Sequence, residues 1–175
     1  LMELYEWGWI KKIPRIAVIN ASGANTLYRL FNGHFENEKL RWDDGIPNFN
    51  LIQNLYDKML EDESLKPKTK ETAIQIGKPA NITKGLRALD FTNGVVEEVT
   101  DTEMLDGMSV VGLNGFDCEM ASGASVAGIK KLRDKEIIKK DDKVVGILTG
   151  RQKEPLLPID YHNDPANRFA RPPKN

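Results

Sequence analysis

Thr149 stands at the end of the most strongly apolar segment of the chain, residues 143–150, and is followed by Gly150. Runs of Val, Ile and Leu favour a buried strand, so we predict a strand here. A hydroxyl at the carboxyl end of such a strand can point into a ligand cleft at the edge of a sheet. It can equally bond the neighbouring backbone. Spacing alone leaves both interpretations of Thr149 open.

A second candidate site is the sequence Ser-Gly-Ala at residues 22–24, which follows the apolar run 15–19 and precedes a helical spacing. Backbone N–H groups at the start of a helix attract anions, which suggests a phosphate site. The segment has neither a full G-x-G-x-x-G nor a P-loop pattern. A tight turn between strand and helix is therefore the favoured interpretation.

Cys118 is the single cysteine, and it precedes Glu119 and a helix start that is rich in small residues. A thiol near a helix start can be reactive. The two histidines, His34 and His162, are far away in sequence and give little support for a Cys/His pair or a metal site. We therefore expect a buried structural cysteine and no metal ligand in this chain.

Strands alternating with helices predict an α/β fold with a mostly parallel, twisted sheet flanked by helices. The chain opens with what resembles the last turns of a helix, which Gly8 would stop. Thr100 and Glu103 match a capping box at a helix start. The expected strands are 15–19, a half-exposed 95–99, and 143–150; the expected helices are 24–31, 47–60, a segment from 81 or 83 to 91, one that begins at 100–103, and 122–132, with a turn at 72–77.

The composition limits the class of protein. The chain has 175 residues, 40% of them hydrophobic, and 25 Lys and Arg against 26 Asp and Glu. This balance gives no basic surplus for nucleic acid, and no apolar run approaches the ~20 residues that span a bilayer. A single cysteine suits a reducing cytoplasm. Residues 32–70 form a polar, charged insertion, and the proline-rich tail 151–175 is expected to be irregular.

Four blocks of sequence together resemble the C-terminal half of the threonine synthase family. They are Ala-Ser-Gly-Ala-Asn-Thr-Leu at 21–27, Thr-Ala-Ile-Gln-Ile-Gly-Lys-Pro at 72–79, Cys-Glu-Met-Ala-Ser-Gly-Ala-Ser-Val-Ala-Gly at 118–128, and Val-Val-Gly-Ile-Leu-Thr-Gly at 144–150. The ending around residues 161–173 is similar to members with a longer mid-domain insertion. The resemblance covers nearly the whole chain and implies a fold-type-II, tryptophan synthase β-like enzyme, of which residues 1–175 are the C-terminal, largely cofactor-domain portion.

The resemblance implies a lyase that uses pyridoxal 5'-phosphate (PLP) to convert O-phospho-L-homoserine and water to L-threonine and phosphate. In this family the threonine of the Leu-Thr-Gly block, here Thr149, hydrogen-bonds the pyridine nitrogen of PLP. Such a neutral hydroxyl tunes how strongly the ring withdraws electrons. By the same resemblance, Ala73 belongs to a segment that lines the cofactor, and Glu119 begins a segment at the edge of the site.

The lysine that forms the Schiff base and the loop that holds the phosphate belong, by the resemblance, to an N-terminal half upstream of this chain. We therefore expect the chain alone to be inactive and its partners to be that half and, for the intact enzyme, a second copy in a homodimer. Arg151 departs from the histidine that the family pattern leads us to expect. Another fold-type-II lyase or dehydratase, or a free-standing α/β binding module, remain the alternatives.

Overall fold

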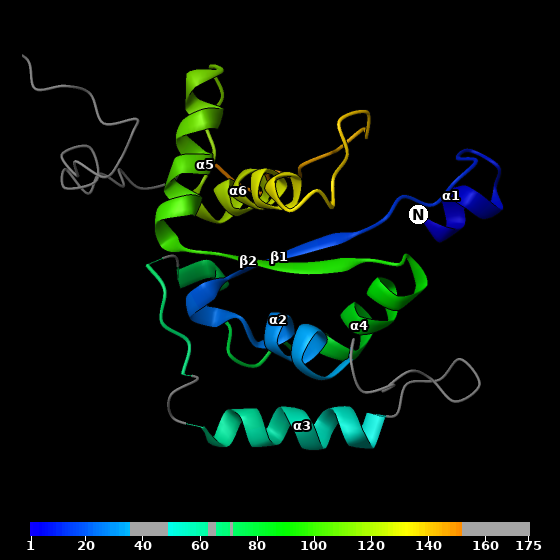
Figure 1. Cartoon of the computed structure of the whole chain (residues 1–175), viewed down its shortest axis with the longest axis vertical. Helices are drawn as coiled ribbons and strands as arrows, with labels where there is room; N and C mark the ends of the chain where they lie inside the picture. Colours follow the sequence, from blue (N-terminus) through cyan, green and yellow to red (C-terminus); the bar gives the residue numbers. More distant parts are fainter. Residues whose placement is uncertain (36–48, 63–65, 71, 152–175) are drawn as a thin grey trace, which may run out of the picture. The chain divides into compact units, whose positions relative to one another are not determined.

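The computed structural model describes residues 1–35, 49–62, 66–70 and 72–151 (Figure 1). No helix in these ranges is both long enough and apolar enough to span a membrane. In chain order the elements are α1 (Met2–Glu6), β1 (Ala17–Ala21), the 3-10 turn η1 (Ser22–Ala24), α2 (Thr26–Leu30), the π-helical turn η2 (Phe31–Phe35), α3 (Phe49–Glu61), the 3-10 turn η4 (Thr72–Ile74), α4 (Ile82–Phe91), β2 (Val95–Val99), α5 (Asp101–Leu113) and α6 (Met120–Asp134).

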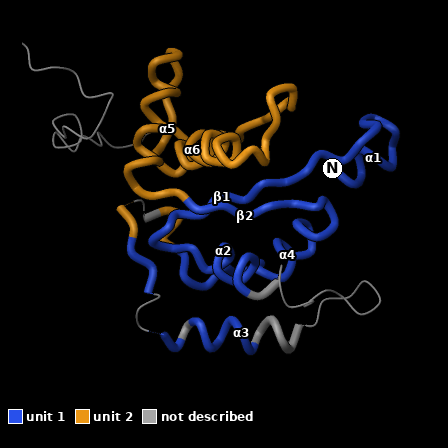
Figure 2. Tube along the Cα trace, viewed as in Figure 1, with its two compact units in different colours: residues 1–68, 76–98 blue, residues 69–75, 99–175 orange. Residues whose placement is uncertain are grey.

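The chain forms two compact units, which Figure 2 shows in different colours. Unit 1 consists of residues 1–68 and 76–98, and unit 2 of residues 69–75 and 99–175. The described part of the insertion predicted at 32–70 lies in unit 1 except for residues 69 and 70, which belong to unit 2, and α3 confirms the helix expected at 47–60. The irregular tail predicted at 151–175 lies, apart from Arg151, outside the described residues.

Unit 1 contains a small parallel sheet made by β1 and β2, in which the amide of Val95 donates to the carbonyl of Ile16 at 3.0 Å. The two strands expected here are confirmed, but the half-exposed pattern expected for 95–99 is wrong. Val96 and Glu97 are both buried, although successive side chains of a strand point to opposite faces. Strands of parallel sheets are commonly covered on both faces, which breaks the polar–apolar alternation.

The main apolar cluster of unit 1 comes from three helices. Leu30 of α2, Tyr56 of α3, and Ile82 and Leu86 of α4 are buried against one another. Burying a large apolar side chain contributes about 2 kcal/mol to stability, so this cluster holds the short helices in place. Burial, and secondarily the carboxylate of Asp57, raises the pKa of Tyr56.

The first helix ends where the sequence predicted. The amides of Trp7 and Gly8 donate to carbonyls of the last turn of α1. Gly8 has a φ of +73°, a left-handed conformation that costs glycine little and other residues more. Local sequence therefore determines this helix stop.

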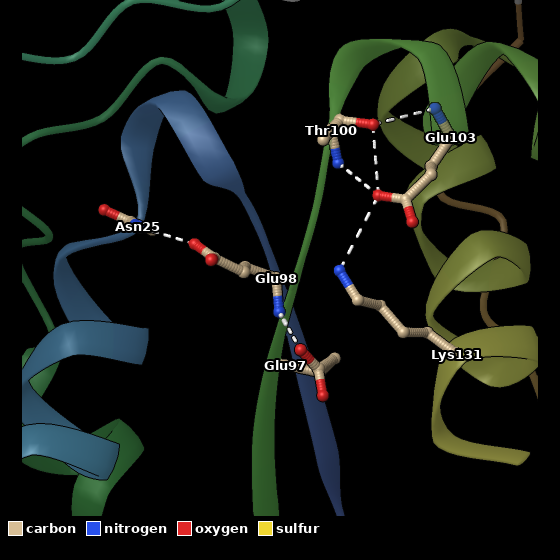
Figure 3. A network of polar contacts seen from close by, with 6 residues as sticks. All are labelled: Asn25, Glu97, Glu98, Thr100, Glu103 and Lys131. Carbon is tan, nitrogen blue, oxygen red and sulfur yellow. Dashed lines mark hydrogen bonds and ion pairs between the residues drawn. The ribbon is translucent and has the colours of Figure 1, made fainter. Parts of the chain in front are cut away.

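The capping box of α5 in unit 2 is also confirmed (Figure 3). The amide of Glu103 donates to the hydroxyl of Thr100 at 3.2 Å, and the amide of Thr100 donates to the Glu103 carboxylate at 2.7 Å. Lys131 of α6 lies 3.7 Å from the same carboxylate. One glutamate thus stabilises the start of α5 and links it to α6.

The pairing of α5 and α6 depends on two glycines that face each other. A Cβ added to Gly107 would overlap the carbonyl oxygen of Gly123, and one added to Gly123 would overlap the carbonyl oxygen of Met104. The two backbones approach each other closely because neither position has a side chain. The small-residue start expected for the helix at 122–132 therefore packs against a second helix.

The strand predicted at 143–150 is wrong for this chain. The segment has no strand assignment, and its apolar side chains are exposed, with Val145 at 87%. A strand forms only when a neighbour supplies hydrogen-bond partners along its length. Within the described residues the paired strands are β1 and β2 alone, so the β propensity of this segment is not realised.

Candidate functional site at the start of α6

The first turn of α6 positions the end of the apolar segment. The backbone amide of Glu119, the N-cap residue of α6, donates to the carbonyl oxygen of Gly150 at 3.1 Å. Three residues further on, the buried hydroxyl of Ser122 accepts from the amides of Thr149 and Gly150 at 3.0 and 3.2 Å. Two backbone donors of an unpaired segment are thus satisfied by one side chain.

The side chains of Thr149 and Glu119 meet at this point. The Thr149 hydroxyl donates to Oε1 of Glu119 at 3.4 Å, a long and therefore weak bond. The Glu119 side chain makes no capping bond to α6, although its residue is the N-cap. The carboxylate lies instead beside Gly150, where an added Cβ would come within 2.7 Å of Oε2. Glycine at position 150 therefore leaves room for the carboxylate.

The predicted site residues do not all gather here. Thr149 and Glu119 lie together, and the Thr149 hydroxyl faces the side chains of Glu119 and Ser122. The cleft interpretation of Thr149 stays a prediction. Ala73 lies elsewhere in unit 2, in the turn η4, with its side chain exposed. The turn expected at 72–77 is confirmed as this short 3-10 turn.

Residues 69 and 70, which precede η4, are tied to the start of α5. The hydroxyl of Thr69 and the amide of Lys70, at 2.9 Å for the latter, both donate to the carboxylate of Asp101. Asp101 is the first residue of α5 and follows the Thr100 cap. Asp101 thus anchors residues 69 and 70, close to Ala73 in sequence. The role predicted for Ala73, that it lines the cofactor, stays a prediction.

Sequence patterns did not indicate that Ser122 holds the backbone of residues 149 and 150. Its only signal was its place in a Ser, Ala and Gly-rich helix start, which indicated close approach but not which segment approaches. The other candidate at residues 22–24 forms a 3-10 turn between β1 and α2, in agreement with the tight-turn interpretation. In that turn the carbonyl of Gly23 accepts from the amide of Lys68 at 2.6 Å.

Arg151 lies at the outer edge of the site. Its Nε is 3.5 Å from a carboxylate oxygen of Asp117, and its side chain is largely exposed. An exposed ion pair of this kind contributes little to stability, between about 0 and 1 kcal/mol. Arg151 is therefore directed to Asp117 and solvent.

Cys118 is a buried structural cysteine, as expected, with 2% of its surface exposed. Burial raises the pKa of its thiol, and the negative charges of Asp117 and Glu119 raise it further. Thiolate is the reactive form, so a raised pKa makes this thiol a poor nucleophile. No group of three or more His, Cys, Asp or Glu that could hold a metal ion occurs among the described residues.

We expect Cys118 to react with iodoacetamide more than about tenfold more slowly in the folded chain than in denaturant, since attack requires local opening. Intact mass reports the reaction without ambiguity, because the chain has one cysteine. The unfolded thiol loses its proton at lower pH than the folded one, so the free energy of unfolding should fall as pH rises above the ordinary thiol value of 9.0. Equal labelling rates in the two states would contradict this burial, and Cys118→Ser is the unlabelled control.

Comparison with known families identifies the chain. The family described as pyridoxal-phosphate dependent enzyme matches residues 2–150, which include α6 and the Thr149 segment. The chain belongs to this family. The small parallel sheet with flanking helices agrees with the fold-type-II architecture of these PLP-dependent enzymes.

Within the PLP-dependent family, the individual relatives that the chain resembles include several threonine synthases. The chain is 34% identical to a threonine synthase of Methanosarcina acetivorans over 88% of its own length, and 32% identical to one of Methanocaldococcus jannaschii over 90%. It is 30% identical to threonine synthase 2, chloroplastic, of Arabidopsis thaliana over 96%. The chain spans 41%, 34% and 29% of the lengths of these three relatives.

Proposed function

We propose that this chain is the C-terminal, largely cofactor-domain part of a threonine synthase-like lyase. The reaction converts O-phospho-L-homoserine and water to L-threonine and inorganic phosphate. The observation that carries the proposal is the likeness to threonine synthases over most of the chain, with Thr149 held at the start of α6. The reducing cytoplasm is the compartment that suits its single cysteine.

The residues at the start of α6 fit PLP by their chemistry. Thr149 offers a neutral hydroxyl donor whose present bond to Glu119 is long, so a pyridine nitrogen can replace the carboxylate as acceptor. When bound, PLP supplies an electron sink for carbanion chemistry next to the substrate amino group. Thr149 would hold the ring nitrogen, and Glu119 and Ala73 would line the cofactor. The roles proposed here for these described residues are to position the cofactor.

An N-terminal half, which the greater length of the relatives suggests, is the partner that this proposal requires. Residues 144–148 carry the exposed apolar side chains Val144, Val145, Ile147 and Leu148. The segment bonds α6 through Ser125 and pairs with no strand among the residues that the structure describes. Exposed apolar surface of this kind marks an interaction site. We propose that this segment, called here the open segment 144–148, completes a strand of a larger sheet when the N-terminal half is present. A homodimer of the intact enzyme is a further proposal.

Arg151 is the reason to consider a second candidate function, that of another fold-type-II lyase or dehydratase. The family pattern leads us to expect an imidazole at this position, whereas this chain has the guanidinium of Arg151, which faces Asp117. A related fold-type-II lyase or dehydratase would tolerate that change if it needs no proton transfer there. Of the two enzyme classes, the threonine synthase reaction remains better supported by the relatives. If the longer polypeptide that includes the upstream half binds no PLP, a non-catalytic binding module is the favoured alternative.

The test compares this chain with a longer polypeptide that includes the upstream half. We expect the longer polypeptide to bind PLP and release phosphate from O-phospho-L-homoserine, while the 175-residue chain releases none. Release of an oxo acid from threonine or serine without phosphate turnover would favour the dehydratase. Phosphate release by the 175-residue chain alone, or a longer polypeptide that binds no PLP, would contradict the proposal.

A further inference from the structure

The Ser122 hydroxyl is placed so that all of its hydrogen-bonding capacity is directed at residues 149 and 150. Ser122 is 1% exposed and belongs to the first turn of α6. Its oxygen accepts from the amide of Thr149 at 3.0 Å and from the amide of Gly150 at 3.2 Å. A hydroxyl has two acceptor lone pairs, and these two N–H groups occupy both.

Ser122 can then still donate its own hydroxyl proton to one acceptor. The acceptors within reach are the hydroxyl oxygen of Thr149 at 3.5 Å and the carbonyl oxygen of Gly150 at 3.4 Å. That carbonyl already accepts from the amide of Glu119. The Thr149 hydroxyl donates its own proton to Glu119, so its oxygen has lone pairs to spare. Since the Thr149 proton is directed to Glu119, the 3.5 Å contact between the two hydroxyls can form only with Ser122 as its donor.

We propose that Ser122 is a positioning residue that directs the proton of the Thr149 hydroxyl. A proton donated by Ser122 to the Thr149 oxygen orients the proton of Thr149 away from Ser122. That proton points to Glu119 in the present structure and is available to a ring nitrogen in its place. Thr149 so accepts from Ser122 and donates to the group on its other side, which suits an unprotonated pyridine nitrogen. The ring-nitrogen part rests on the proposed function.

The neighbouring serine provides a matched control. Ser125 lies three residues after Ser122 on the same helix and donates its hydroxyl to the carbonyl of Ile147 at 3.0 Å. It therefore fastens the same segment to α6 without touching Thr149 or Gly150 in the contacts described. Removing either hydroxyl deletes a contact between the segment and α6, but only the loss of Ser122 should free the amides of residues 149 and 150 and change the direction of the Thr149 proton.

The first measurement is amide hydrogen exchange in the 175-residue chain. Ser122→Ala should speed exchange of the Thr149 and Gly150 amides by about tenfold or more, because each loses its acceptor. Ser125→Ala should leave these two amides within about twofold of the parent chain, since neither amide bonds Ser125. Should Ser122→Ala fail to fold, Ser122→Cys keeps the size of the side chain with a weaker acceptor and donor. Unchanged exchange in both Ser122 variants would overturn the proposal.

The second measurement separates orientation from simple fastening. In the longer polypeptide loaded with PLP labelled with ¹⁵N in the ring, Ser122→Ala should move the ring-nitrogen resonance toward that of a pyridine without a donor. Ser125→Ala should leave it in place. Faster exchange with an unmoved resonance would show a merely structural role and overturn the inference. A parent protein that binds no PLP would overturn the proposed function instead, together with the ring-nitrogen part of this inference.

Discussion

Replacing Gly107 with alanine should lower the free energy of unfolding of unit 2 by about 3 kcal/mol, at the upper end of overpacking costs. The added Cβ would overlap the carbonyl oxygen of Gly123 and lie 3.0 Å from the Gly123 carbonyl carbon and 3.1 Å from the Ala127 nitrogen. All three neighbours are backbone atoms, which cannot rotate away as a flexible side chain can. The two helices must therefore separate along their contact. Urea titration followed by circular dichroism measures the effect.

Gly112 provides the matched control for this substitution. It lies on the same helix, α5, and an added Cβ there meets nothing within 4 Å. Alanine is favoured over glycine in a helix by about 1 kcal/mol, so Gly112→Ala should stabilise the chain slightly. If both variants changed stability in the same direction and by a similar amount, the close approach of α5 and α6 would not be the cause.

Placing a glutamate at Val145 should weaken association with the N-terminal half by about 100-fold, or about 2.7 kcal/mol. Val145 is the most exposed of the apolar side chains in the open segment 144–148. If that segment enters a sheet of the complete enzyme, Val145→Glu would bury an unpaired carboxylate there. In the chain alone the same side chain remains in water, so stability should change by no more than about 0.5 kcal/mol.

The measurement is a titration of the separately expressed N-terminal half, alongside a thermal melt of each chain variant. Val145→Thr is the control, since threonine has a similar shape and retains β propensity. We expect it to associate nearly as tightly as the parent chain. Association of Val145→Glu at the parent affinity would show that the open segment is not the contact surface, whatever the activity of the assembled protein.

Elements with internal hydrogen bonds were the ones that local sequence predicted well. The Thr100–Glu103 capping box and the stop at Gly8 depend on a few adjacent residues, and the structure confirms both. The amphipathic spacing of α3 likewise predicted a helix whose Tyr56 is buried against α2 and α4. A helix satisfies its own backbone groups, so a short window of sequence contains most of the information.

In the candidate site, too, the sequence indicated some residues and only the structure showed the others. The resemblance singled out Thr149 and Glu119, and the structure places their side chains together, while their roles toward a cofactor stay predictions. The contribution of Ser122 was not visible in the sequence. Its hydroxyl accepts from the amides of residues 149 and 150 only when these residues, 27 and 28 positions away, lie against the first turn of α6.

The sequence by itself determined the family of this protein, its helices and their caps, and the apolar character of residues 143–150. Only the tertiary structure decided that those residues stay outside the β1–β2 sheet and mostly exposed and that Ser122 satisfies the amides at their end. The physical reason is that a strand takes its hydrogen-bond partners from another segment. Side-chain type predicts how strongly a segment favours a sheet, but the position of a neighbour decides whether the sheet is formed.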